Sequence, residues 1–360
     1  MVETTSDDGR GSASVESDAS PRDLLGSFVH RLAGDERPLP VEGRLASFDG
    51  ATGWLNSGPL TPADLRGRVV LVDFWTYTCI NWLRTLPYLR AWDAKYREHG
   101  LTIVGAHTPE FGFERDVDNI TARAEEFGVT YPVAIDSQYG VWQAFSNHFW
   151  PAVYVADADG RLRYHHFGEG EYAMTEMVIQ QLLKEAGQDG SDPDLVMVEP
   201  RGFDVAADWR TLRVPETYVG YRQAAGFASP DGLRADIPHR YPATGRLALG
   251  QWAPVGAWTM ASHAGIVAEA PASIVFRIQA RDVNLVMGPT PKGAAIPFRV
   301  RLDGAAPGDA HGFDVKPDGG GTLMDQRLYQ LIREPGAVRE RTFEVEFLGS
   351  GAEAYCFTFG

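Results

Sequence analysis

The chain has 360 residues, of which 44% are hydrophobic and 22% are charged, which is the composition of a soluble globular protein with more than one domain. Its net charge of −15 would repel polyphosphate and anionic lipid, so we expect neither nucleic acid nor a membrane as a partner. Only two cysteines occur, Cys79 and Cys356, which excludes a secreted disulfide scaffold. Because the N-terminus also lacks the pattern of a secretory signal, we expect a cytoplasmic location.

The first forty residues divide into two short regions. Residues 1–20 carry almost nothing to bury, which predicts a disordered acidic tail. Apolar residues at helical spacing then predict a short helix and linker over 21–41. From 42 to 56 the pattern alternates and is broken by Asp49-Gly50, which predicts a β-hairpin.

A layered α/β domain is predicted over residues 42–187. The run 69–75 is apolar apart from Asp73, as expected of a central strand covered on both faces. Further strand patterns occupy 101–106, 132–135, 152–156 and 161–167. Helical patterns over 80–98, 114–127 and 174–184 alternate with them.

The composition changes after residue 187. A region rich in Gly, Pro and acidic residues opens a predicted linker over 188–214. Short strands with period-two alternation then predict an all-β sandwich or jelly roll over 215–360. Cys356 lies in one of these strands, and its apolar neighbours predict a side chain buried inside the sandwich.

Cys79 joins the 69–75 strand to the following helix. At a helix N-terminus the free N–H groups and the helix dipole stabilise a thiolate, so we expect a thiol pKa below the ordinary value and a nucleophilic cysteine. An inert core cysteine is the alternative. Trp150-Pro151 precedes the 152–156 strand, where a cis proline can hold backbone beside a bound thiol-containing substrate; an ordinary proline at a strand entry is the alternative.

The residues 65–75 (LRGRVVLVDFW), with Cys79, Pro87 and Trp150-Pro151, resemble those of TlpA/ResA-like and AhpC/TSA-type redoxins of the thioredoxin superfamily. A closer similarity is to the soluble C-terminal part of DipZ-type thiol–disulfide proteins. It extends from about residue 43 to the C-terminus through the segments 79–81, 105–111, 149–152, 167–170, 215–218 and 355–360. The resemblance implies a thioredoxin fold followed by a carbohydrate-binding-module-like β-sandwich, and a thiol-dependent oxidoreductase.

One position departs from the pattern that the resemblance implies. Trp82 stands where those proteins carry a second, resolving cysteine. One-cysteine chemistry remains: Cys79 attacks a small peroxide to give a sulfenic acid, or attacks a disulfide to give a mixed disulfide. An external thiol reductant or a thioredoxin-type protein then resolves the product. We expect no cofactor and no metal, because the histidines lack ligand spacing around Cys79.

Several other residues are expected to support the thiolate or position the substrate. Asn81 and Trp82 shape the entrance, Arg84 or His107 stabilises the thiolate or donates a proton, and Glu110 orients an acid or binds an amine; a solvated loop is the alternative for the residues after 106. The full set of candidate supporting residues is Trp75, Asn81, Trp82, Arg84, His107, Glu110, Trp150, Pro151 and Glu169.

A second function fits the same chain. Trp82 in place of a resolving cysteine is also what a redox-inactive scaffold protein would carry. Its β domain would then supply ligand or carbohydrate binding, with Trp209, Trp252 and Trp258 as a stacking platform; core packing is the alternative for these aromatic residues.

Overall fold

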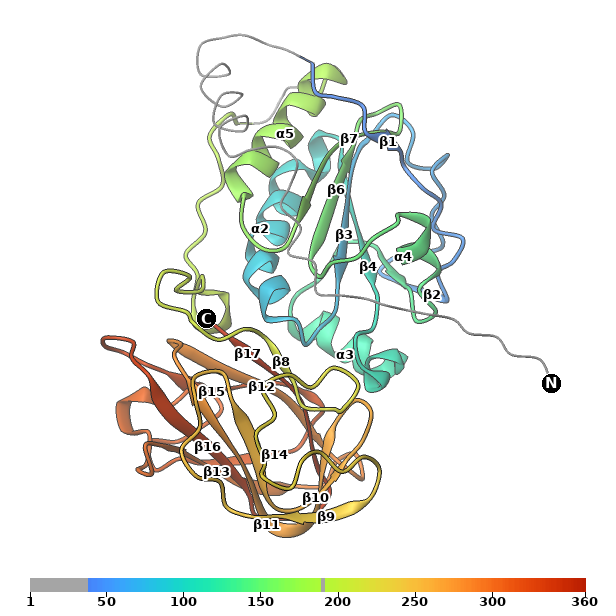
Figure 1. Cartoon of the computed structure of the whole chain (residues 1–360). Helices are drawn as coiled ribbons and strands as arrows, with labels where there is room; N and C mark the ends of the chain where they lie inside the picture. The colour runs from blue at the N-terminus through green and yellow to red at the C-terminus, as the bar shows by residue number, and fades with distance from the viewer. Residues whose placement is uncertain (1–37, 189–191) are drawn as a thin grey trace, which may run out of the picture. The chain divides into compact units, whose positions relative to one another are not determined.

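The computed structural model describes residues 38–188 and 192–360 (Figure 1). Residues Val41–Gly360 form one compact unit, and the fold and contacts below belong to that unit. The tail predicted over 1–20 and the helix predicted within 21–41 lie outside the described residues or at their margin. The predicted domain boundaries near 187 and 215 remain predictions.

The first part of the unit is a seven-stranded sheet in the order β1-β7-β6-β3-β4-β5-β2. Strands β3, β4 and β5 run parallel, and the other pairs are antiparallel. All seven residues of β3 are buried, as the apolar run predicted. The strands are β1 (Gly43–Arg44), β2 (Gly53–Leu55), β3 (Val69–Trp75), β4 (Leu101–His107), β5 (Val133–Ile135), β6 (Ala152–Ala156) and β7 (Arg161–Phe167).

Helices cover both faces of this sheet (Figure 1). Helices α2 (Ile80–Tyr96) and α5 (Tyr172–Glu185) lie on one face, and α4 (Gly140–Ala144) lies against the other. On the α4 face, Val141 and Phe145 join a core cluster with Val72 and Phe74 of β3. The remaining elements are α3 (Val117–Glu126) and the 3-10 turns η1 (Arg97–His99) and η2 (Gly112–Arg115).

The prediction of a β-hairpin over 42–56 is wrong. Its two arms pair with opposite edges of the sheet, β1 with β7 and β2 with β5. A turn does form at Asp49-Gly50, but Phe48 beside it is buried in the core and Gly50 packs so tightly against Gly140 that a Cβ there would lie 2.5 Å from backbone. Because packing of Phe48 and Gly50 against the rest of the domain draws this segment across the sheet, its two arms do not pair with each other.

The second part of the unit is a curled antiparallel sheet, which confirms a thioredoxin fold followed by a β-sandwich. Its main strand order is β14-β13-β16-β11-β17-β12-β15. The strands are β8 (Thr217–Tyr218), β9 (Pro238–Tyr241), β10 (Trp252–Met260), β11 (Gly265–Ile278), β12 (Asp282–Pro289), β13 (Ile296–Leu302), β14 (Gly320–Leu323), β15 (Arg327–Arg333), β16 (Arg341–Phe347) and β17 (Ala352–Phe359). The turns η3 (Gly202–Asp204) and η4 (Gly308–Ala310) lie outside the sheet.

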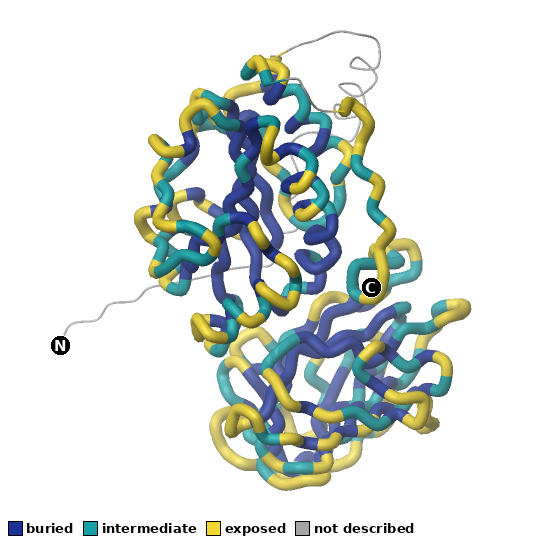
Figure 2. Tube along the Cα trace, turned by 180° about the vertical axis from the view of Figure 1, so that it is seen from behind, coloured by how far each residue is buried: buried dark blue, intermediate teal, exposed yellow. Residues whose placement is uncertain are grey.

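Burial follows the strands of this sheet, while the loops are largely exposed (Figure 2). Trp252 and Trp258 are completely buried in its core, so they pack rather than form a stacking platform. Trp209, by contrast, is exposed.

A β-bulge changes which face of the sheet Cys356 occupies. On β17, Cys356 pairs with Val286 and Ala354 pairs with Met287, which leaves Tyr355 as the extra residue. Ala354 belongs to the sandwich core, whereas Tyr355 and Cys356 do not. Cys356 is buried, but the prediction that it lies inside the sandwich is wrong, because the bulge interrupts the alternation on which the prediction relied.

Candidate active site around Cys79

Cys79 occupies the N-cap position of α2 and is half-buried. Its backbone is extended, with φ −76° and ψ 111°, and its side chain does not cap the helix. The Cys79 thiol donates to the carbonyl oxygen of Trp150 at 3.7 Å, and the Trp150-Pro151 peptide bond is cis. Cys79 and the Trp150-Pro151 pair, distant in sequence and both predicted as site residues, therefore lie side by side.

The Trp150 side chain is itself held in place. Its Nε1 donates to the carbonyl oxygen of Thr108 at 3.0 Å, and its ring lies 4.2 Å from that of Trp142. The loop after β4, the helix α4 and the cis-proline segment are thereby joined beside the sulfur. The carbonyl that faces Cys79 has a defined orientation.

Burial raises the pKa of Cys79 well above its ordinary value, so the predicted lowering is wrong. The negative charges of Glu110 and Glu216 add to this effect. The backbone N–H groups of Trp82 and Asn81 act in the expected direction and favour the thiolate, but burial and the two carboxylates prevail. At neutral pH, Cys79 is therefore mainly a thiol.

Glu110 comes from the loop after β4 but is not the solvated residue of the alternative interpretation. It accepts a hydrogen bond from the Tyr218 hydroxyl of β8, and Tyr218 also donates to Glu216 at 3.5 Å. Burial and the charges of Glu216 and Glu114 raise the pKa of Glu110. A carboxyl that holds its proton to higher pH thus lies close enough to Cys79 to affect its ionisation.

Glu114 fixes the loop that carries Glu110 through hydrogen bonds. It is completely buried and accepts hydrogen bonds from Thr78 Oγ1 at 2.6 Å and from the backbone N–H groups of Glu110 and Phe111 at 2.6 and 2.8 Å. Because Thr78 precedes Cys79 directly, Glu114 ties the cysteine segment to the loop that carries Glu110.

Trp82 does not shape the entrance, as the sequence predicted, but lies in the interior. It is completely buried, its ring stacks on that of Trp75 at 4.2 Å, and its Nε1 donates to Oδ2 of Asp73 at 2.9 Å. Burial raises the pKa of Asp73 to about 7. The Trp82 side chain therefore packs between α2 and strand β3.

His107 lies edge-on to Trp75, with ring centroids 4.7 Å apart. Burial lowers the pKa of His107 to about 3, so the imidazole is neutral at physiological pH and supplies no positive charge to a thiolate. Neither of its ring nitrogens has a hydrogen-bond partner in the described parts of the chain.

Arg84 and Glu169 form an ion pair with each other, at 3.1 Å between Nη1 and Oε1. Both side chains are buried. Arg84 also lies close to Gly360, because a Cβ on Gly360 would be 2.2 Å from Arg84 Nη2. The Arg84 guanidinium is thus paired with the Glu169 carboxylate rather than with Cys79.

Sequence reasoning missed three residues near the thiol: Glu114, Glu216 and Tyr218. The segment containing Glu216 and Tyr218 was noted only as part of a resemblance, and nothing local connects it with a cysteine more than a hundred residues earlier. Nothing in the sequence around Glu114 marks it as a site residue. Asp73 is marked by its position, because it is the single polar residue of an apolar strand.

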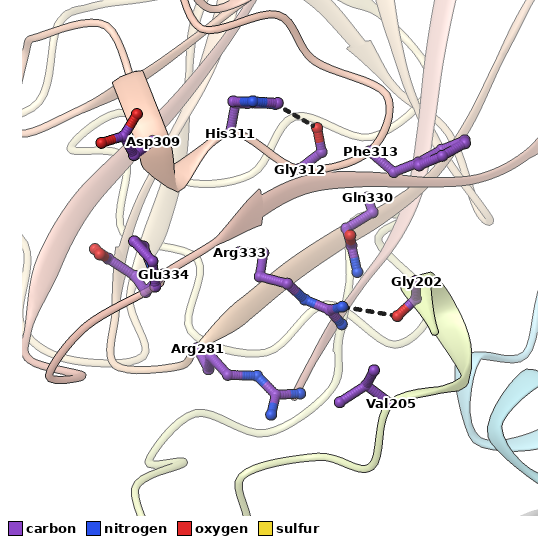
Figure 3. Close-up of a pocket in the computed structure, with 11 residues that line it drawn as sticks. Gly202, Val205, Arg281, Asp309, His311, Gly312, Phe313, Gln330, Arg333 and Glu334 are labelled. Carbon is purple, nitrogen blue, oxygen red and sulfur yellow. Dashed lines mark hydrogen bonds between the residues drawn. The ribbon is translucent and has the colours of Figure 1, made fainter. Parts of the chain in front are cut away.

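A second candidate site is a hollow of about 480 Å³ between the segment of Gly202 and Val205 and loops of the β domain (Figure 3). Phe313, His311 and Arg333 are among its lining residues. Arg333 donates to the Gly202 carbonyl oxygen at 2.7 Å and pairs with Asp282 at 2.7 Å, and Arg281 also pairs with Asp282. These cations are thus neutralised within the chain, and the hollow offers no evident reactive group.

Among residues 38–188 and 192–360, no group of three or more His, Cys, Asp or Glu is arranged to hold a metal ion. No helix in the same ranges is long and apolar enough to cross a membrane.

Comparison with known proteins finds similarity in both parts of the chain. Residues 214–360 match a family described as "Thioredoxin like C-terminal domain". Protein DipZ of Mycobacterium bovis is 34% identical over 253 residues, which cover 69% of this chain and 35% of DipZ. The chain therefore spans about a third of the length of that relative.

Smaller relatives match the first part alone. Thiol-disulfide oxidoreductase YkuV of Bacillus subtilis is 31% identical over 150 residues, which cover 41% of this chain and 96% of YkuV. A solved structure described as a thioredoxin-like protein in the oxidised form is 30% identical, covers 40% of this chain and 96% of its own, and has a TM-score of 0.37.

Proposed function

Because this chain belongs to the thioredoxin-superfamily redoxins related to DipZ, we propose that it is a thiol–disulfide oxidoreductase with Cys79 as its nucleophile. Relatives named as thiol-disulfide oxidoreductases support a thiol–disulfide redox role. The observation that carries the proposal is the partly buried Cys79 at the start of α2, whose thiol donates to the Trp150 carbonyl.

The proposed step is thiol–disulfide exchange. The Cys79 thiolate attacks one sulfur of a substrate disulfide, a new S–S bond forms to Cys79, and the second substrate sulfur departs as a thiolate that takes up a proton. A thiol, either a small reductant or a thioredoxin-type protein, supplies the next exchange. These partners and a cytoplasmic location remain predictions.

The charges around Cys79 favour disulfides over peroxides as substrates. Cleavage of a peroxide places negative charge on a leaving oxygen, which is far more basic than the thiolate that leaves a disulfide and therefore depends more on a neighbouring cation. The charged groups that affect the ionisation of Cys79 are Glu110 and Glu216, both acidic. Arg84, the candidate cation, is occupied by Glu169. We therefore place peroxide reduction second.

Intact mass and peptide mapping after exposure to oxidised glutathione test the proposal. We expect a glutathione adduct on Cys79 that is absent in Cys79→Ser, with hydrogen peroxide giving a slower reaction at the same concentration. Since the pKa of Cys79 is raised, the adduct should form slowly at pH 7 and about tenfold faster for each added pH unit until the thiol titrates.

The scaffold function remains the alternative, and the same measurement separates the two. A folded protein whose Cys79 forms no adduct at any pH up to about 10 contradicts the proposal and supports a redox-inactive binding protein.

A further inference from the structure

We propose that Cys356 is the resolving cysteine for Cys79. The β domain then supplies the second sulfur, because Trp82 occupies the position in α2 where a resolving cysteine would lie. This inference rests on the proposed function, because it needs Cys79 to react with a disulfide first. It assigns a redox role to Cys356, whose strand pattern predicted only a buried residue of the sandwich core.

The first support is the face of the sheet on which Cys356 lies. Around the bulge, Ala354 and Phe357 belong to the sandwich core, while Tyr355 and Cys356 between them do not. Cys356 is nevertheless only 1% exposed. Its cover therefore lies outside the sandwich core, on the face that Tyr355 shares.

The second support is what Tyr355 contacts. Its ring packs on those of Phe111 and Phe113, with centroids 5.4 and 4.9 Å apart. Phe111 follows Glu110 directly, and its backbone N–H donates to Glu114, which also holds Thr78. The residue before Cys356 thus packs on the loop that is tied to the residue before Cys79.

The third support comes from the strand beside Cys356. In the β8–β17 pair, Cys356 lies opposite Tyr218, whose hydroxyl donates to Glu110. Glu110 in turn affects the ionisation of Cys79. Two connections, through Tyr355 and through Tyr218, therefore lead from Cys356 to the loop that lies beside Cys79.

Electrostatics agree with this arrangement. Burial raises the pKa of Cys356, as do the charges of the same two carboxylates, Glu216 and Glu110, that act on Cys79. Cys79 itself also raises the pKa of Cys356. Groups that affect one another in this way share one neighbourhood.

The proposed chemistry balances without a further reagent. A substrate disulfide reacts with Cys79 to give a mixed disulfide and one substrate thiol. The Cys356 sulfur then attacks the Cys79 sulfur, the Cys79–substrate bond breaks, and the departing thiolate takes the proton that Cys356 loses. The sum is one disulfide and two protein thiols converted to one intrachain disulfide and two substrate thiols. An external dithiol reverses the oxidation of the protein.

In the resting structure both sulfurs are held by backbone carbonyls. Cys79 donates to Trp150, and Cys356 donates to the carbonyl oxygen of Phe357 at 3.6 Å. Formation of the mixed disulfide removes the Cys79 thiol proton and with it the contact to Trp150. That sulfur is then free to turn toward the β domain, and disulfide geometry sets how closely the two residues must approach.

The test uses the full chain and oxidised glutathione, followed by acid quenching, denaturation, alkylation and non-reducing peptide mapping. We expect the wild type to yield a Cys79–Cys356 peptide pair, with both thiols protected from alkylation and little glutathione retained. Cys356→Ala should instead accumulate the glutathione adduct on Cys79. Thr358→Ala, a buried position outside the core on the same strand, is the matched control and should behave as wild type.

Cys356→Ser provides a second variant if the alanine variant does not fold. If the wild type retains glutathione on Cys79 while Cys356 remains alkylatable, the inference fails and the proposed function stands. A Cys79–Cys356 pair that appears only in a disulfide-linked dimer, and decreases on dilution, also overturns it. If Cys79 forms no adduct in the wild type or in either variant, the proposed function fails as well.

Discussion

At the scale of single residues, Asp73 is a carboxyl group enclosed within the thioredoxin fold. It is completely buried, and Oδ2 accepts a hydrogen bond from Trp82 while Oδ1 has no partner in the described residues. Burial is the largest influence on its ionisation and raises the pKa of Asp73 from 3.8 to about 7. The Trp82 bond opposes this rise without cancelling it.

This raised pKa predicts a pH-dependent gain in stability for Asp73→Asn. Between pH 3.8 and about 7 the folded chain keeps a proton on Asp73 that the unfolded chain has lost. The stabilisation from that proton is complete below the unfolded value and is lost as the pH rises through the folded value. The asparagine cannot ionise and still offers Trp82 an acceptor.

We therefore expect Asp73→Asn to raise the free energy of unfolding by roughly 1–4 kcal/mol at pH 8, and by clearly less at pH 5. Urea denaturation at the two pH values measures it. His107, whose pKa is lowered, titrates in both proteins, so the difference between them isolates Asp73. An equal gain at both pH values would contradict the assignment.

At the scale of elements, the first turn of α2 decides what chemistry the helix can perform. Cys79 occupies the N-cap position and Trp82 lies three residues later, so both belong to the same turn. Trp82 stacks on Trp75 beneath the helix. The indole thus occupies interior volume that packing requires, and its replacement has a structural cost as well as a chemical effect.

For Trp82→Cys we expect a loss of about 3–5 kcal/mol in unfolding free energy, since a large buried ring is removed. The introduced thiol should nevertheless form a disulfide with Cys79 under mild oxidant, and insulin reduction should rise above the wild-type rate. Trp82→Ala is the matched control, with a similar cavity and no thiol. A folded Trp82→Cys chain with both thiols free would show that the helix start has a different geometry.

At the scale of the whole molecule, the Arg84–Glu169 pair lies where elements distant in sequence meet. Both side chains are buried, and Arg84 lies close to Gly360 at the end of the β domain. Breaking a buried pair is costly because it leaves an uncompensated charge, whereas replacing both partners with neutral groups can be nearly neutral.

Glu169→Gln should therefore destabilise the chain by about 3–5 kcal/mol in urea denaturation, and Arg84→Met combined with Glu169→Gln should recover most of that loss. Glu171→Gln, an exposed neighbour, serves as the control and should change stability little. If Glu169→Gln lowers the free energy of unfolding no more than Glu171→Gln does, the charge of Arg84 does not depend on Glu169 and the prediction is wrong.

Local patterns in the sequence were enough to locate the elements that carry the nucleophile. The apolar run 69–75 predicted β3 with its bounds, and the helical pattern after it placed Cys79 at the start of α2. The later strands of the first sheet were predicted for the same reason: period and composition report on a residue's own neighbours along the chain.

What surrounds the nucleophile was decided by tertiary structure. The pKa of Cys79 depends on Glu110 and on Glu216, of which only Glu110 was expected near the thiol, and their charge and the burial of the sulfur outweigh the helix terminus. Likewise, one bulge residue turned Cys356 away from the sandwich core, and burial of Phe48 separated the arms of an expected hairpin. The sequence by itself determined the thioredoxin-like α/β order, the β domain and the position of Cys79. Only the folded chain decided its ionisation and its neighbours, because desolvation and Coulomb interactions depend on distance in space rather than along the chain.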